Sequence, residues 1–150
     1  MLHTALPDHT EASALRTWHL TAVAAGVAVL FQLWGLYRVS GPPQTPWVPC
    51  ADKVQHAIGF ALPVLLILVT LALRGRFSWR WPGPRTSVLI VAIFAAHGVV
   101  SEIIQHLWYR YRTGDLLDVL TDWVGIALGV LLFRLVFVRR SRAVESLAIS

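Results

Sequence analysis

The sequence has little charge and almost no cysteine, and both shortages narrow what the chain can be. Only 14% of its 150 residues are charged and 56% are hydrophobic, whereas soluble domains average about 25% charged residues. Its single cysteine, Cys50, excludes a disulfide within the chain. A Gly-rich phosphate loop, a C-x-x-C pair and a G-x-S-x-G nucleophile motif are also missing. What remains is one strongly apolar domain without the common short catalytic motifs.

Four long apolar segments dominate the sequence, at about residues 18–37, 54–73, 87–108 and 119–138. Each has the roughly 20 residues that cross a hydrocarbon core of about 30 Å. We therefore predict an all-α fold, a four-transmembrane-helix bundle spanning residues 18–138, with tails at 1–17 and 139–150. A retained first helix is favoured over a cleaved signal peptide, because Asp8 and Glu11 precede it and no small-residue cleavage pattern follows.

The basic residues are shared unequally between the two sides of the predicted bundle. Four spans place both termini and the middle loop on one side. That side carries nine arginines: Arg16, Arg74, Arg76, Arg80, Arg85, Arg134, Arg139, Arg140 and Arg142. The other side carries four basic residues: Arg38, Lys53, Arg110 and Arg112. The excess predicts cytoplasmic termini in a plasma (inner) membrane. Topology therefore explains the net charge of +5 better than nucleic-acid binding does.

Three polar clusters lie at the predicted outward-facing ends of the last three segments. They are Asp52-Lys53-Val54-Gln55-His56, Glu102-Ile103-Ile104-Gln105-His106, and the run from Arg112 through Asp115 and Asp118, followed by Asp122. Residues three or four apart share one face of a helix, so each cluster forms a one-sided polar stripe. Ionisable groups are costly beside hydrocarbon, and such stripes face the bundle interior. We predict that His56, Glu102 and the Asp118/Asp122 pair converge in a pocket below the outer surface.

The order and spacing of these residues resemble the VanZ-like family of small bacterial membrane proteins, named for a member associated with teicoplanin resistance. The resemblance rests on Asp52-Lys53-x-x-His56, Glu102-x-x-Gln105, Arg112-x-x-Asp115-x-x-Asp118 and the Gly125/Gly129 pair, over about residues 50–132. The chain departs from the family pattern at Asp122, where Asn is usual. The resemblance implies a role in the cell envelope, with teicoplanin (glycopeptide) resistance as the associated phenotype.

The leading functional hypothesis is an enzyme embedded in the membrane that acts at its outer face. The catalytic candidates are Asp52, His56, Glu102 and Asp118, and the substrate- or anion-binding candidates are Lys53, Gln105, Arg112, Asp115 and Asp122. His56, oriented by Asp52 or Asp118, would act as general base or nucleophile, and Glu102 would be the partner acid. Arg112 would hold an anionic group such as phosphate. The expected partners are membrane lipids and a lipid-linked envelope precursor or a glycopeptide, and no nucleic acid.

Other interpretations stay open. Asp52 could simply be the N-cap of the second helix, and the polar residues could tie helices together in a non-enzymatic scaffold or ligand-binding protein. His56, Glu102, Asp118 and Asp122 are chemically suitable Zn²⁺ or Mn²⁺ ligands. No H-E-x-x-H spacing supports that version, so the sequence predicts no metal site. A transporter is disfavoured, because four helices are few and no inverted repeat is visible.

Overall fold

The computed structural model describes residues 9–38, 50–74, 81–110 and 114–148. These residues form four helices and no strand: α1 (His9–Tyr37), α2 (Ala51–Leu73), α3 (Pro84–Trp108) and α4 (Leu116–Ala148). Each helix contains a segment long and apolar enough to cross a membrane: Ser13–Tyr37, Ala51–Leu73, Pro84–Trp108 and Leu116–Ser141. The predicted all-α bundle of four membrane-spanning helices is confirmed.

Two helices extend well beyond the predicted apolar segments. α1 begins at His9, inside the predicted N-terminal tail, and α4 continues to Ala148 through most of the predicted basic tail. Both extensions are free of Pro and Gly and contain Ala, Leu, Glu and Arg, which are good helix formers. Hydropathy therefore marks where a helix is apolar, and it misses the polar turns that prolong the same helix.

The residue that caps the start of α2 is not Asp52, which the sequence offers as a possible N-cap. The N-cap residue is Cys50, with a left-handed backbone (φ 61°) and no side-chain capping bond. The N-cap assignment for Asp52 is therefore wrong, because this carboxylate lies inside the first helical turn. There it interacts favourably with the positive end of the helix dipole.

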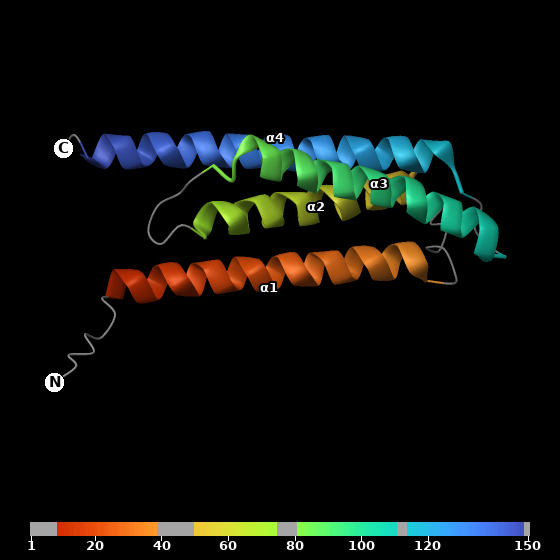
Figure 1. Cartoon of the computed structure of the whole chain (residues 1–150), viewed down its shortest axis with the longest axis horizontal. Helices are drawn as coiled ribbons and strands as arrows, with labels where there is room; N and C mark the ends of the chain where they lie inside the picture. Colours follow the sequence, from red (N-terminus) through yellow and green to blue (C-terminus); the bar gives the residue numbers. More distant parts are fainter. Residues whose placement is uncertain (1–8, 39–49, 75–80, 111–113, 149–150) are drawn as a thin grey trace.

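The helices run alternately up and down, as Figure 1 shows. α2 lies between α1 and α4 and packs against both, whereas α3 packs mainly on α4. The first turn of α1 and the last turn of α4 lie at one end of the bundle, together with the end of α2 and the start of α3. The predicted common side for both termini matches this arrangement, and its assignment to the cytoplasm stays a prediction.

The core follows one face of α2. Phe60, Val64 and Leu68 recur every four residues and are at most 1% exposed, which is the helical spacing for a single buried stripe. Phe94 of α3 meets Phe60 edge to face, and Phe133 of α4 completes the same cluster. Many large apolar side chains on the outer faces remain exposed, among them Leu20, Leu30, Val88, Ile93, Leu107 and Val124. Such an apolar outer surface is consistent with contact with membrane lipid.

Two glycines of α4 lie directly on the backbone of α2. A Cβ added at Gly125 would collide with the carbonyl oxygen of Ala57, and one at Gly129 with that of Ala61. Small residues spaced in this way let two helix backbones approach closely in a membrane. The G-x-x-x-G pair Gly125/Gly129 is thus a packing contact between α4 and α2.

Replacing Gly125 with Ala should destabilise the bundle. The added methyl group must push α4 away from Ala57, and overpacking of this kind typically costs about 1–3 kcal/mol. Gly59→Ala is the matched control, because a Cβ at Gly59 meets nothing within 4 Å. Thermal unfolding in detergent should show a lower midpoint for Gly125→Ala than for the wild type, and Gly59→Ala should not lower the midpoint. Equal midpoints for the two variants would contradict the packing described here.

Candidate functional site

The polar clusters meet at one end of the bundle, where α2 and α4 begin and α3 ends. His56 is five residues inside α2, and Glu102 and Asp122 are each six residues from the nearby ends of α3 and α4. At 1.5 Å per residue all three lie about 8–9 Å below the helix ends. Three separate helices therefore deliver ionisable side chains to a similar depth.

The centre of the site is a buried cluster of His56, Glu102 and Asp122, called here the polar trio. One possible donor atom from each residue lies within 4.8 Å of the other two. His56 is 8% exposed, Glu102 5% and Asp122 0%. The structure thus brings together three of the four residues expected to converge, and Asp118 lies at the edge of the trio.

His56 is oriented by Asp122. Its Nδ1 lies 2.8 Å from Oδ1 of Asp122, whereas its Nε2 is 3.9 Å from Oδ1 of Asp118. When Asp122 is ionised its carboxylate only accepts hydrogen bonds, and the Nδ1–H of His56 is then the donor in this pair. The prediction that Asp52 or Asp118 orients His56 is therefore corrected to Asp122, one helical turn deeper on α4 than Asp118.

Two carboxylate oxygens in the polar trio have no hydrogen-bond partner within the described part of the chain. Glu102 accepts the backbone N–H of Asp115 at Oε2 (2.9 Å), but its Oε1 is buried and unpaired. Asp122 uses Oδ1 for His56 and leaves Oδ2 unpaired. Gly98 makes room for this oxygen, because a Cβ there would lie 3.0 Å from Oδ2. Buried polar atoms are nearly always paired, so these two point to a missing partner.

Lys53, the only lysine of the chain, occupies the rim of the site. Its Nζ donates to Asp115 Oδ2 (2.7 Å) and Asp118 Oδ1 (2.5 Å), and lies 3.5 Å from Asp52 Oδ2. Lys53 and Asp115, both predicted to bind substrate, are thus paired with each other. The ammonium group joins α2 to the beginning of α4.

Gln105 bonds to α1 and not to the polar trio. Gln105 is 2% exposed, and its Nε2 donates to the carbonyl of Leu36 on α1 (3.3 Å). The Tyr109 hydroxyl, which the sequence analysis missed, donates to the neighbouring carbonyl of Tyr37 (2.6 Å). Both contacts fasten the end of α3 to α1. Arg112 lies outside the described residues.

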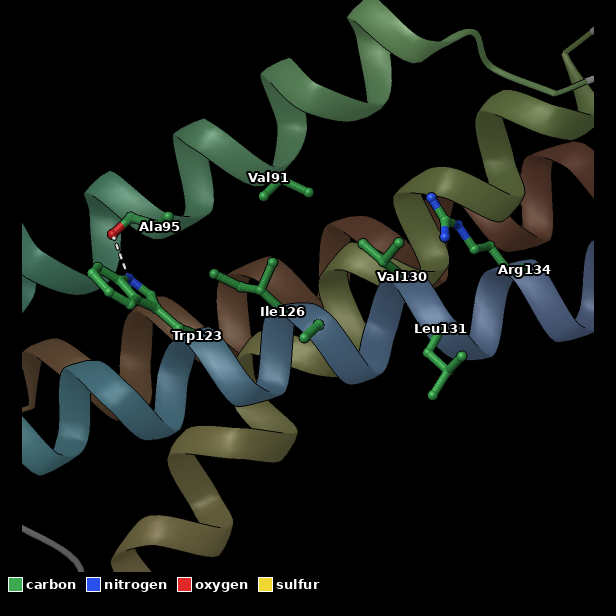
Figure 2. Close-up of a pocket in the computed structure, with 8 residues that line it drawn as sticks. Val91, Ala95, Trp123, Ile126, Val130, Leu131 and Arg134 are labelled. Atoms are coloured by element: carbon green, nitrogen blue, oxygen red, sulfur yellow. Dashed lines mark hydrogen bonds between the residues drawn. The ribbon is translucent and has the colours of Figure 1, made fainter.

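A second feature without a clear sequence signal is an apolar groove between α3 and α4 (Figure 2). It encloses about 570 Å³ and is lined by Val91, Ala95, Trp123, Ile126, Ala127, Val130, Leu131 and Arg134. The Trp123 indole N–H donates to the carbonyl of Ala95 (3.3 Å) at one end, and Arg134 lies at the other. Trp123 directly follows Asp122 in the sequence, so the groove begins near the level of the polar trio.

Comparison with protein-family models, curated proteins and solved structures found no match for this chain. The VanZ-like resemblance therefore stays a prediction carried by its motifs.

The Asp115 carboxylate provides a pH test of the rim. The hydrogen bond from Lys53, with that from the Leu117 backbone N–H, holds the pKa of Asp115 below its ordinary value. A depressed folded-state pKa contributes stability above the unfolded value of about 3.9, and this stability is lost as pH falls through the lower folded value. Lys53→Met should therefore raise the pKa of Asp115, measured by ¹³C NMR of its carboxyl group in detergent. Asp52→Asn should leave that pKa low, and an unchanged titration in Lys53→Met would refute the ion pair.

Proposed function

We propose that this chain is an integral membrane protein of the cell envelope whose polar trio catalyses proton transfer on a lipid-linked or other envelope substrate. One observation carries the proposal: three ionisable side chains from three helices, each less than a tenth exposed, share one site. Ionisable groups inside membrane-spanning helices are costly and commonly mark functional sites. A purely structural tie would not require two carboxylates and an imidazole.

The His56–Asp122 pair supplies a general base. With Nδ1–H donated to Asp122, the lone pair of His56 Nε2 is available to a substrate hydroxyl or water. That hydroxyl would give its proton to Nε2 as its oxygen attacks. A protonated Glu102 would return a proton to the leaving oxygen. This division of roles supports hydrolysis or group transfer at an ester or phosphoester.

The surroundings favour a substrate attached to lipid. The apolar groove beside Trp123 offers space for a hydrocarbon chain that reaches the level of Asp122. The arginine excess supports an orientation in which the site faces away from the cytoplasm. Together with the motif resemblance, these features support a VanZ-like envelope protein and a link to glycopeptide resistance.

A non-enzymatic scaffold or ligand-binding protein is the second candidate, and the rim of the site favours it. Lys53 joins α2 to Asp115 and Asp118, and Glu102 of α3 accepts the Asp115 amide. These bonds connect the ends of three helices without any chemistry. Interhelical hydrogen bonds in membranes average about 0.6 kcal/mol, so such a network stabilises the bundle only modestly.

Conservative variants distinguish the two candidates. His56→Gln and Glu102→Gln should each reduce turnover of an envelope lipid extract by about 100-fold or more, the usual contribution of general acid–base catalysis. His106→Gln is the matched control, because His106 is exposed near the same end of α3. Turnover would be followed by mass spectrometry with the reconstituted full-length protein, and teicoplanin susceptibility would be measured in parallel. Folded His56 and Glu102 variants that retain the teicoplanin phenotype would establish the scaffold instead.

A further inference from the structure

We infer that the polar trio binds a divalent transition-metal cation, Zn²⁺ or Mn²⁺, through His56, Glu102 and Asp122. The inference deepens the proposed function at the same site, but it gives activation of the nucleophile to the ion and makes His56 and Glu102 its ligands. Only the chemical use of the ion rests on that function, since binding itself can be measured without any substrate.

The donor geometry suits one ion. Donor atoms of the three residues lie within 4.8 Å of one another, and they come from three different helices. Around an ion with bonds of about 2.0–2.2 Å, donors in tetrahedral positions are about 3.3–3.6 Å apart. Small side-chain rotations would bring the three donors to that spacing. A fourth position would remain for water or substrate, as in catalytic zinc sites.

The unpaired oxygens are a second, independent indication. Glu102 is 95% buried and Asp122 fully buried, yet Glu102 Oε1 and Asp122 Oδ2 have no hydrogen-bond partner in the described residues. Each carboxylate uses its other oxygen for a protein contact, to the Asp115 amide or to His56. One free oxygen per carboxylate is what monodentate binding of a cation requires. The Asp115 amide would orient Glu102, as outer-shell hydrogen bonds do in metal sites. His56 would exchange its bond to Asp122 for the ion and bind it through Nδ1, because an ion on Nε2 would be out of reach of Asp122 while that bond remained.

The local charge balance also favours a cation. Five carboxylates gather at this end of the bundle: Asp52, Glu102, Asp115, Asp118 and Asp122. Among the described residues, the basic groups that contact them are Lys53 and His56. Lys53 contacts only the rim residues Asp52, Asp115 and Asp118. Within the described part of the chain, the two carboxylates of the polar trio therefore share one imidazole. A divalent ion would balance them both and leave His56 neutral, the form in which imidazole binds metals.

The donor types select the ion. One imidazole with two carboxylates suits Zn²⁺ or Mn²⁺, whereas Mg²⁺ prefers oxygen ligands in octahedral geometry and keeps several waters. Affinity for nitrogen and oxygen sites is higher for Zn²⁺ than for Mn²⁺. When the ion is bound, His56 is a ligand, and water on the ion replaces the imidazole as the source of an activated nucleophile.

Binding of Zn²⁺ and Mn²⁺ alone tests the inference. Full-length protein in detergent, stripped with chelator, should bind one ion saturably in calorimetric titration, with Zn²⁺ tighter than Mn²⁺ and Mg²⁺ weakest. Glu102→Gln and Asp122→Asn should each weaken binding by at least about 10-fold, since even outer-shell changes cost 10–100-fold. Two controls should bind like the wild type: His106→Gln removes an exposed histidine, and Asp52→Asn removes a rim carboxylate.

Several results would overturn the inference. These are a wild-type protein that binds neither ion, undiminished affinity in both Glu102→Gln and Asp122→Asn, or loss of binding in His106→Gln. If the trio variants do not fold, X-ray absorption at the zinc edge of the wild type decides. One imidazole with oxygen donors supports the trio, and two imidazoles or none refutes it. Metal binding without turnover would remove the proposed enzyme and keep this site. Turnover by metal-free protein would keep the enzyme and remove only the chemical role given to the ion.

Discussion

The structure depends on pairing ionisable side chains inside an otherwise apolar bundle. In hydrocarbon an unpaired charge is costly, so each such group must find its partner on a neighbouring helix. Lys53 and His56 of α2 reach Asp118 and Asp122 of α4, and Glu102 of α3 holds the Asp115 amide. These contacts lie at one end of the bundle, and they fix how the three helices are aligned along their axes. The rim carboxylates are paired with Lys53, whereas two oxygens of the polar trio have no hydrogen-bond partner among the described residues.

Small residues make that pairing geometrically possible. Gly125 rests on the carbonyl of Ala57, the residue next to His56, so α2 and α4 touch just below the pair of His56 and Asp122. Gly98 of α3 leaves space for the Asp122 carboxylate. With larger side chains at these positions the helices would separate, and the short hydrogen bonds of the trio would be lost. The packing of the bundle and the chemistry of the site therefore have the same physical basis.

Sequence patterns predicted the four spans well, because about 20 apolar residues in a row have few alternatives. Helical spacing also predicted that the stripes containing His56, Glu102 and Asp122 would face one another. Periodicity did not identify Asp122 as the partner of His56, because Asp118 and Asp122 lie on the same face of α4 one turn apart. The choice between them depends on the axial position of α4 against α2, which the contact of Gly125 with Ala57 defines. The groove beside Trp123 was missed for a similar reason, since it depends on how α3 and α4 pack.

The central functional claim is that the end of the bundle that holds the polar trio faces away from the cytoplasm, and the chain contains a natural probe of this claim. Cys50 is its only cysteine, is exposed, and immediately precedes α2 at the end of the bundle where the trio lies. We expect a membrane-impermeant maleimide to label the protein in intact cells that express it, and the Cys50→Ser variant to remain unlabelled. Labelling of Cys50 only after the cells are permeabilised would place the site on the cytoplasmic side and contradict the account.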